Sequence, residues 1–132
     1  MFLDTSAVLR ALLEGDAALA AAMRDAPRLL ASSLLEVELA RVFLRPDAHA
    51  IDTRAARQAI AALLEPAELK PIDMHVLSRA KEQFPREPVR ALDAIHLATA
   101  LSFEAQIGDI AIASCDARLR ENARMLGFSL VP

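Results

Sequence analysis

Two aspartates in this sequence stand in the same local setting, although they are far apart along the chain. Asp4 follows the apolar residues 1–3, Asp116 follows the apolar run 110–113, and each precedes a helical pattern. The carboxyl ends of parallel strands meet at one edge of a sheet, where α/β proteins bind ligands. Either residue alone could simply cap its helix, but two at one edge indicate a shared polar site.

A third acid, Glu38, lies in a polar stripe on an otherwise mostly apolar helix. At about 100° per residue, Glu38, Arg41 and Arg45 fall within about 60° of one another. The stripe faces either a polar pocket or solvent, where Glu38 and Arg41 would form an i,i+3 pair. Glu36 has a local explanation, because Ser33 and Glu36 fit a capping box.

A fourth acid, Asp93, falls in the first turn of a helix, where the helix dipole favours an anion. That helix is apolar nearly all round and is therefore expected to be buried, so an acid within it needs a partner. His96 is the candidate partner, three residues further along. The alternative is that His96 is a core histidine with hydrogen bonds of its own.

An alternating order of strands and helices is predicted to position these residues. Predicted strands cover residues 1–3, 29–31, 69–72, 110–113 and 129–131. Predicted helices cover residues 6–14, 17–26, 34–44, 53–64, 74–84, 91–103 and 117–126, with Pro46 ending the third and Asp52 or Thr53 beginning the fourth. Such alternation predicts a parallel sheet with helices on both faces, in one domain spanning residues 1–132.

The composition narrows the class of protein. With 132 residues, 55% hydrophobic and 25% charged, the chain is expected to fold around a real core. An aromatic content of 4%, without Trp or Tyr, argues against the base-stacking platforms of single-strand binders. A formal charge of −3 argues against a general basic footprint, so nucleic-acid contacts would depend on local arginines or bound cations.

Three features of the sequence predict a cytoplasmic location. Cys115 is the single cysteine, which excludes an internal disulfide and suits a reducing compartment. Asp4 interrupts what would be the apolar core of a signal peptide. The apolar runs are also too short to span a bilayer, so no membrane association is expected.

Four segments occur in the order found in PIN-domain proteins: LDTSA at 3–7, ELAR at 38–41, LDAIHLATA at 92–100 and SCDARL at 114–119. Over nearly its whole length the chain resembles the VapC-type toxins of bacterial toxin–antitoxin pairs. The resemblance implies a PIN-like three-layer α/β/α sandwich with a short, mostly parallel central sheet. It also implies an endoribonuclease that uses Mg²⁺ or Mn²⁺ and is restrained by a cognate antitoxin.

The resemblance also assigns the site residues. The family's metal-site acids correspond to Asp4, Glu38, Asp93 and Asp116, and its pocket hydroxyls match Ser6 and, where the family more often has Thr, Ser114. Clustered carboxylates repel by roughly 4 kcal/mol per pair at an effective dielectric of about 20, so cations or protons must neutralise them. Oxygen ligands without a Cys or His cluster select hard ions. We expect Asp4, Asp93 and Asp116 to hold the ion, Glu38 to bind it or orient the attacking water, and Ser6 to fix Asp4.

The expected partners are an RNA substrate and an antitoxin. The phosphate could be steered by Arg41 and Arg45, or by Arg86, Arg90 and Arg118. Apolar helices on either side of Pro27, together with the third helix, are expected to leave surface for the antitoxin or for a homodimer. Such an antitoxin could insert an arginine among the acids in place of the metal charge.

Two other interpretations remain open from the residues. A Mg²⁺-dependent phosphoryl-transfer or receiver-like domain also places acids at strand ends, but it usually needs a lysine at the site, and Lys70 and Lys81 lie outside the strand-end motifs. A catalytically silent PIN fold used for partner binding is the second. The presence of all four acids counts against it.

Overall fold

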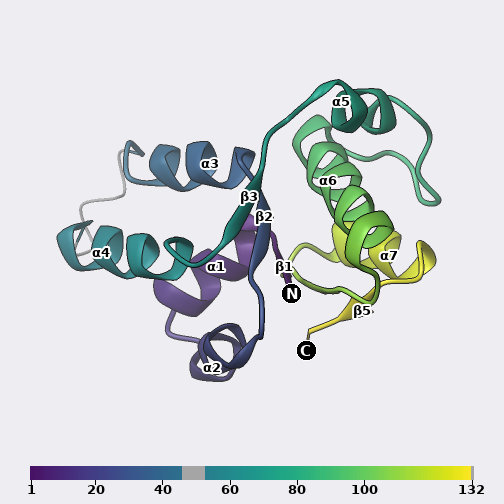
Figure 1. Ribbon diagram of the computed structural model, residues 1–132. Coiled ribbons are helices and arrows are strands. Elements are labelled where there is room, and N and C mark those ends of the chain that lie inside the picture. The colour runs from purple at the N-terminus through teal and green to yellow at the C-terminus, as the bar shows by residue number, and fades with distance from the viewer. Residues whose placement is uncertain (46–52, 132) are drawn as a thin grey trace.

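The fold is built on a short parallel sheet. The structure, a computed structural model, describes residues 1–45 and 53–131. Five parallel strands lie in the order β3-β2-β1-β4-β5 (Figure 1). Their bounds are β1 (Phe2–Leu3), β2 (Leu30–Ser32), β3 (Glu68–Lys70), β4 (Ala111–Ala113) and β5 (Ser129–Leu130). β1, the first strand of the chain, therefore lies at the centre of the sheet.

Helices cover both faces of this sheet, as expected. They are α1 (Thr5–Leu12), α2 (Ala17–Asp25), α3 (Leu34–Val42), α4 (Thr53–Leu64), α5 (Met74–Ala80), α6 (Ala91–Ile107) and α7 (Ala117–Met125). Figure 1 shows α1 to α4 on one side of the sheet and α5 to α7 on the other. The three-layer α/β/α prediction is confirmed. The predicted helix end at Pro46 and helix start at Asp52 lie outside the described residues.

Alternation along the strands divides the interior into two cores. Phe2 faces the core formed with α6 and α7, whereas Leu3 faces the core formed with α1 to α4. Strands β2 and β4 repeat this alternation, with Leu30 and Ile112 in the first core and Ala31 and Ala113 in the second. Full burial of a Phe or Leu side chain contributes about 1.5–3 kcal/mol. Packing on both faces therefore stabilises strands too short to persist through backbone hydrogen bonds alone.

Two helix ends differ from the predictions by more than two residues. α5 ends at Ala80 instead of Phe84, and Phe84 is buried beneath the guanidinium of Arg79, which lies 4.3 Å from the ring centroid. α6 continues to Ile107 instead of stopping at residue 103. It ends where Gly108 adopts a φ of 64°, a conformation that glycine reaches without steric cost.

The capping box predicted at the start of α3 is wrong. The backbone N–H of Ser33 donates to Lys70 O over 2.9 Å, as an extension of the pairing between β2 and β3, so it is not available to Glu36. The Oγ atom of Ser32 accepts instead from Leu34 N over 3.2 Å. Sheet pairing therefore replaces the local cap, and Glu36 is exposed.

The described residues contain neither a membrane-spanning helix nor a disulfide. Within these ranges no helix combines the length and apolar character needed to cross a bilayer. Cys115 is a free, exposed thiol. The cytoplasmic location stays a prediction.

Candidate active site

The centre of the site lies where β1 and β4 end side by side. Leu3 is in register with Ala113, and Asp4 N donates to Ala113 O over 3.0 Å, which brings Asp4 next to Ser114. Asp4 is 5% exposed. Its Oδ2 atom accepts hydrogen bonds from Ser6 N (3.3 Å), from Ser6 Oγ and from Ser114 Oγ (2.8 Å). Both predicted pocket hydroxyls therefore fix one oxygen of Asp4.

Asp116 serves as a helix cap and faces the site at the same time. Its Oδ1 atom accepts from Leu119 N over 2.8 Å and so caps α7. Its Oδ2 atom accepts from Nη2 of Arg90 over 3.0 Å. Ser114 Oγ accepts from Asp116 N over 3.1 Å, which ties this turn to the hydroxyl that also binds Asp4. Asp116 can therefore be both a helix cap and part of a polar site, the two interpretations that the sequence left open.

Asp93 has a different partner from the one expected. It is 8% exposed, and its Oδ2 atom accepts from Nε of Arg90 over 2.7 Å, so the prediction that His96 is its partner is wrong. Arg90 immediately precedes α6 and bridges Asp93 to Asp116. The hydrogen bond that Arg90 donates to Asp93 and the negative charges of Asp93, Asp116 and Asp4 raise the pKa of the Arg90 guanidinium. An arginine among the acids, of the kind that an antitoxin could insert, is thus already present in this chain as Arg90.

Glu38 points inward from α3. The alternative in which its polar stripe faces solvent is therefore wrong for this residue. Its Oε2 atom accepts hydrogen bonds from Thr5 Oγ1 and, over 2.7 Å, from Nε2 of His96. The same His96 nitrogen lies 3.9 Å from Asp4 Oδ1. Burial raises the pKa of the Glu38 carboxyl, but the hydrogen bonds from His96 and Thr5 outweigh burial and hold it below its ordinary value. Arg41, in contrast, is exposed.

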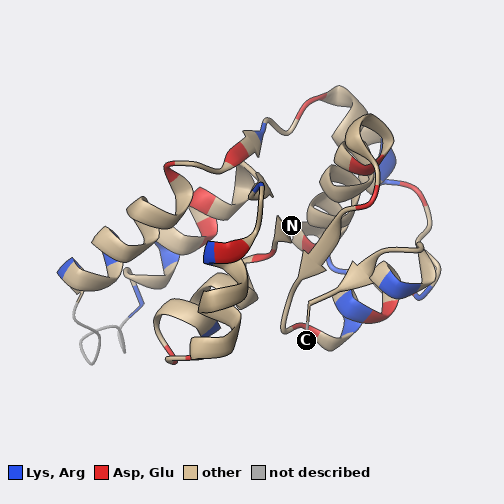
Figure 2. Ribbon diagram, turned by 60° about the horizontal axis from the view of Figure 1, so that its bottom comes forward, with Lys and Arg blue, Asp and Glu red and all other residues tan. Residues whose placement is uncertain are grey.

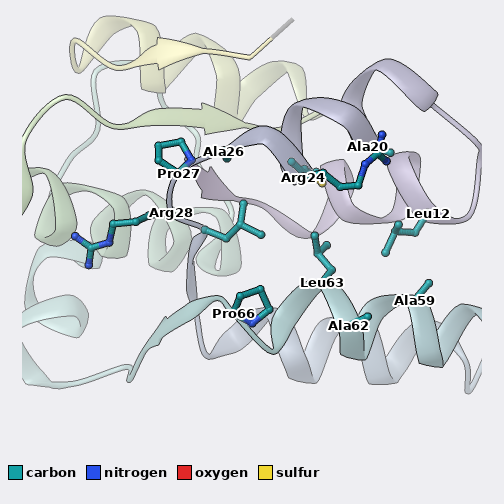
Figure 3. A pocket seen from close by; sticks show the side chains of 12 residues that line it. Leu12, Ala20, Arg24, Ala26, Pro27, Arg28, Ala59, Ala62, Leu63 and Pro66 are labelled. Atoms are coloured by element: carbon teal, nitrogen blue, oxygen red, sulfur yellow. The ribbon is translucent and has the colours of Figure 1, made fainter.

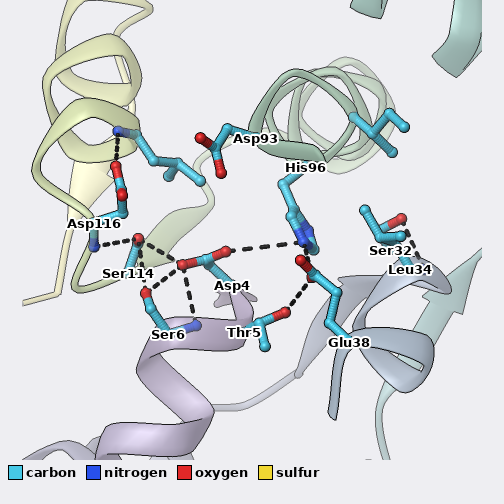
Figure 4. A network of polar contacts seen from close by, with 12 residues as sticks. Asp4, Thr5, Ser6, Ser32, Leu34, Glu38, Asp93, His96, Ser114 and Asp116 are labelled. Carbon is cyan, nitrogen blue, oxygen red and sulfur yellow. Dashed lines mark hydrogen bonds and ion pairs between the residues drawn. The ribbon is translucent and has the colours of Figure 1, made fainter. Parts of the chain in front are cut away.

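Together the four acids approach one place from β1, α3, α6 and the start of α7 (Figure 4). They are linked in two pairs, Asp4 and Glu38 through His96, and Asp93 and Asp116 through Arg90. In residues 1–45 and 53–131, no three His, Cys, Asp or Glu side chains form a group that could hold a metal ion as they stand. The side chains of His96 and Arg90 therefore lie within the acid set.

The basic residues considered for phosphate binding lie in different settings. Arg41 and Arg45 are exposed near the end of α3. Arg86 and Arg118 lie 3.5 Å and 4.0 Å from the carboxylate of Glu121 on α7. Figure 2 shows acidic segments in the middle of the molecule, between the two helical layers, and several basic residues on α7. Positive charge therefore borders the acidic centre on the α7 side.

The lysine required by the phosphoryl-transfer alternative is not beside the acids in the described structure. The Nζ atom of Lys70 lies 5.1 Å from the ring centroid of Phe103, where it makes a cation–π contact. Lys81 follows α5 and is exposed. These positions give that alternative no support.

An apolar groove lies apart from the acids, beside Pro27 (Figure 3). It has a volume of about 620 Å³ and is lined by Leu12, Ala20, Met23, Arg24, Ala26, Pro27, Arg28, Leu29, Ala59, Ala62, Leu63 and Pro66. The prediction of apolar surface around Pro27 agrees with this position. However, α4 rather than α3 forms its second wall. Val37 on α3 and Leu44, just beyond the end of α3, have exposed apolar side chains.

Sequence reasoning singled out the four acids and both serines but missed two contacts that organise them. Thr5 was not considered, although it lies within the Asp-Thr-Ser segment, and Arg90 was named only as a phosphate-binding candidate. Thr5 begins α1 directly after Asp4, which was the available signal. The pairing of Arg90 with Asp116 depends on how α6 packs beside α7 and has no sequence signal.

A parallel sheet sandwiched by helices, with acids from four segments gathered beyond its strand ends, defines a PIN-type α/β protein. Residues 1–125 match the PIN domain family, and the chain belongs to that family. It is 33% identical over 134 residues to "Ribonuclease VapC46" of Mycobacterium tuberculosis, covering 99% of this chain and 95% of the relative. It is 32% identical over 136 residues to "Ribonuclease VapC35" of the same species, with the same coverage.

The fold is similar to that of a solved structure. A chain described as "Toxin-antitoxin complex from Klebsiella pneumoniae" superposes with a TM-score of 0.68, covering 99% of this chain and 95% of that one. The sequence identity is 15%, so this similarity concerns the fold alone.

Proposed function

We propose that this PIN-domain protein is the endoribonuclease toxin of a VapBC-type toxin–antitoxin pair. It hydrolyses RNA phosphodiester bonds at an active site formed by Asp4, Glu38, Asp93 and Asp116. The ion is Mg²⁺ or, as a substitute, Mn²⁺. The observation that carries the proposal is the approach of these four acids, from four separate segments, to one place beyond the ends of β1 and β4. Relationship to two VapC ribonucleases supports the reaction class.

The donor set fits a hard divalent ion, because it consists of carboxylate and hydroxyl oxygens. Asp4, Asp93 and Asp116 would hold the ion, with Glu38 as a further ligand or as the residue that orients water. Holding it with several of these oxygens requires the Arg90 side chain, which is 74% exposed, to move away from Asp93 and Asp116. The chemistry that such an ion supplies is activation of water and neutralisation of charge on the phosphate.

The protein groups have separate duties in this proposal. Ser6 and Ser114 hold Oδ2 of Asp4, so Oδ1 keeps one direction toward the reacting groups. The exposed Arg41 and Arg45 attract the RNA backbone from the α3 side. The arginines near α7 do so from the other.

A metal-dependent cleavage assay tests the function. Purified protein should cleave RNA with Mn²⁺ and lose this activity with EDTA, and Asp4→Asn and Asp93→Asn should each reduce cleavage by more than about 100-fold. Asp73→Asn is the matched control, because Asp73 is the N-cap of α5 and lies outside the acid set. Equal activity in wild type and both site variants would identify a contaminating nuclease and reject the proposal.

The cognate antitoxin is proposed to dock in the groove beside Pro27. The groove is mostly apolar, as the binding surface of an amphipathic helix or an extended apolar segment should be. Ala62→Glu, which places a charge on its wall, should weaken antitoxin binding in a titration while leaving RNA cleavage intact. Ala61→Glu is the control, since Ala61 is exposed on the same helix and does not line the groove. Equal antitoxin affinity in both variants would place the docking surface elsewhere.

A further inference from the structure

His96 is a buried histidine that packs against Phe2 and reaches the acids Glu38 and Asp4. It lies on α6, one turn beyond Asp93, and is 1% exposed. Its ring meets the ring of Phe2 edge-on, with centroids 6.3 Å apart and planes at 74°. Figure 4 shows it directed toward Asp4 and Glu38. The packing of Phe2 therefore sets the plane of an imidazole that points into the site.

The hydrogen bonding of His96 indicates which nitrogen carries the proton. Nε2 lies 2.7 Å from Glu38 Oε2, and an ionised carboxylate can only accept, so Nε2 must donate. Nδ1 is buried and has no hydrogen-bond partner among the described residues. A proton on Nδ1 would be a buried donor without an acceptor, which is costly. The arrangement therefore favours the tautomer with its proton on Nε2.

The result is that one oxygen of Glu38 has two donors. Thr5 Oγ1 and His96 Nε2 both bind Oε2, one from the start of α1 and the other from α6. A glutamate on a helix otherwise samples several rotamers, and the two donors restrict this one to a single direction. The second oxygen, Oε1, is thereby held in a fixed orientation, while the same His96 nitrogen lies 3.9 Å from Asp4 Oδ1.

We propose that His96 is a positioning residue, whose Nε2–H holds Oε2 of Glu38 so that Oε1 is aimed at the water or ion in the acidic site. This inference rests on the proposed nuclease function. His96 does not contact the phosphate itself and acts through Glu38. The part of the histidine that matters is a donor at the Nε2 position, which makes the inference testable with side chains of similar size.

A pair of variants isolates that donor. Gln places an amide N–H near the position of Nε2, whereas Met has a similar length and no donor. His96→Met should lower kcat by about 10–100-fold, the usual cost of losing a group that orients a ligand, with little change in KM, and should weaken Mn²⁺ binding measured by calorimetry. His96→Gln should recover most of both. Thr99→Val is the control, since Thr99 is buried on the same helix and its hydroxyl donates to Ile95 O.

The outcomes distinguish the inference from the function on which it rests. If wild type cleaves RNA with Mn²⁺ but His96→Gln and His96→Met are equally impaired, the positioning role is rejected and the nuclease function stands. If wild type neither binds Mn²⁺ nor cleaves, the nuclease proposal itself fails and the inference falls with it. Imidazole nitrogen NMR of wild-type protein gives a test that does not depend on folding of the variants. Protonated Nε2 supports the role, and Nε2 without a proton overturns it.

Discussion

Arg90 donates from Nε to Oδ2 of Asp93 over 2.7 Å. The same guanidinium reaches Asp116, so a positive charge lies between two carboxylates that are proposed to hold a metal ion. Arg90 and a divalent ion would compete for these oxygens. The competition is mild, because a 74% exposed arginine gains little from an ion pair in water.

Arg90→Gln should therefore bind Mn²⁺ more tightly than wild type in calorimetric titrations, and the difference should be largest at low salt. The free energy of unfolding of the metal-free protein should change by no more than about 1 kcal/mol. Arg86→Gln provides the comparison, because Arg86 pairs with Glu121 away from the acids. Weaker Mn²⁺ binding by Arg90→Gln would instead mean that Arg90 holds the site together.

Substitutions of Asp116 can separate its two roles, which are to cap α7 and to contribute a negative charge to the acidic site. Asp116→Asn keeps an oxygen to cap α7 through Leu119 N but removes the charge, whereas Asp116→Ala removes both. Both variants should lose Mn²⁺-dependent cleavage. In the presence of EDTA, only Asp116→Ala should be destabilised, by about 1 kcal/mol in urea unfolding. Full activity of Asp116→Asn would reduce this residue to a helix cap.

Ser6 is predicted to matter through Asp4. Its hydroxyl donates to Asp4 Oδ2 and accepts from Cys115 N over 2.8 Å, so it ties the start of α1 to the segment that follows β4. Ser6→Ala should reduce cleavage by about 10–100-fold and weaken Mn²⁺ binding. Ser102→Ala should behave as wild type, because Ser102 lines a separate pocket between α5 and α6 together with Lys70. Unchanged Mn²⁺ affinity in Ser6→Ala would show that Asp4 keeps its orientation without this hydroxyl.

Acid should destabilise the metal-free protein partly through Glu38. The pKa of this carboxyl is lowered in the folded protein from an ordinary value of 4.5, so the unfolded chain binds the proton more readily. Its contribution to stability is therefore present above about pH 4.5 and is lost as the pH falls through the lower, folded-state pKa. Urea unfolding in EDTA across this range should show a shallower loss for Glu38→Gln than for wild type. Identical slopes would assign the acid sensitivity to other carboxyls.

The order of elements was predictable from the sequence because the inner strands β1, β2 and β4 lie in apolar runs and several helix starts carry recognisable caps. Asp16, Asp73 and Asp116 each accept a hydrogen bond from the third residue of the helix that they precede. Such local signals depend on neighbours along the chain. The parallel order of the strands followed from alternation with helices.

What was missed depends on packing between distant segments. The capping box failed because Ser33 N pairs with Lys70 O, a residue of another strand. His96 was considered as a partner of Asp93 because the two are one turn apart, yet its Nε2 contacts Glu38 on α3. Periodicity places a residue on a face of its helix, but it does not tell which acid from another layer will meet that face.

The two-residue strand β1 couples Asp4 to the whole molecule, because Phe2 is anchored in one core and Leu3 in the other. Loosening either helical layer would free the side chain of Phe2 or of Leu3 and would change the orientation of Asp4. A damaged or half-folded copy would then be inert toward nucleic acid. For an enzyme proposed to be harmful to its own cell, hydrolysis would thus be confined to chains that have completed folding.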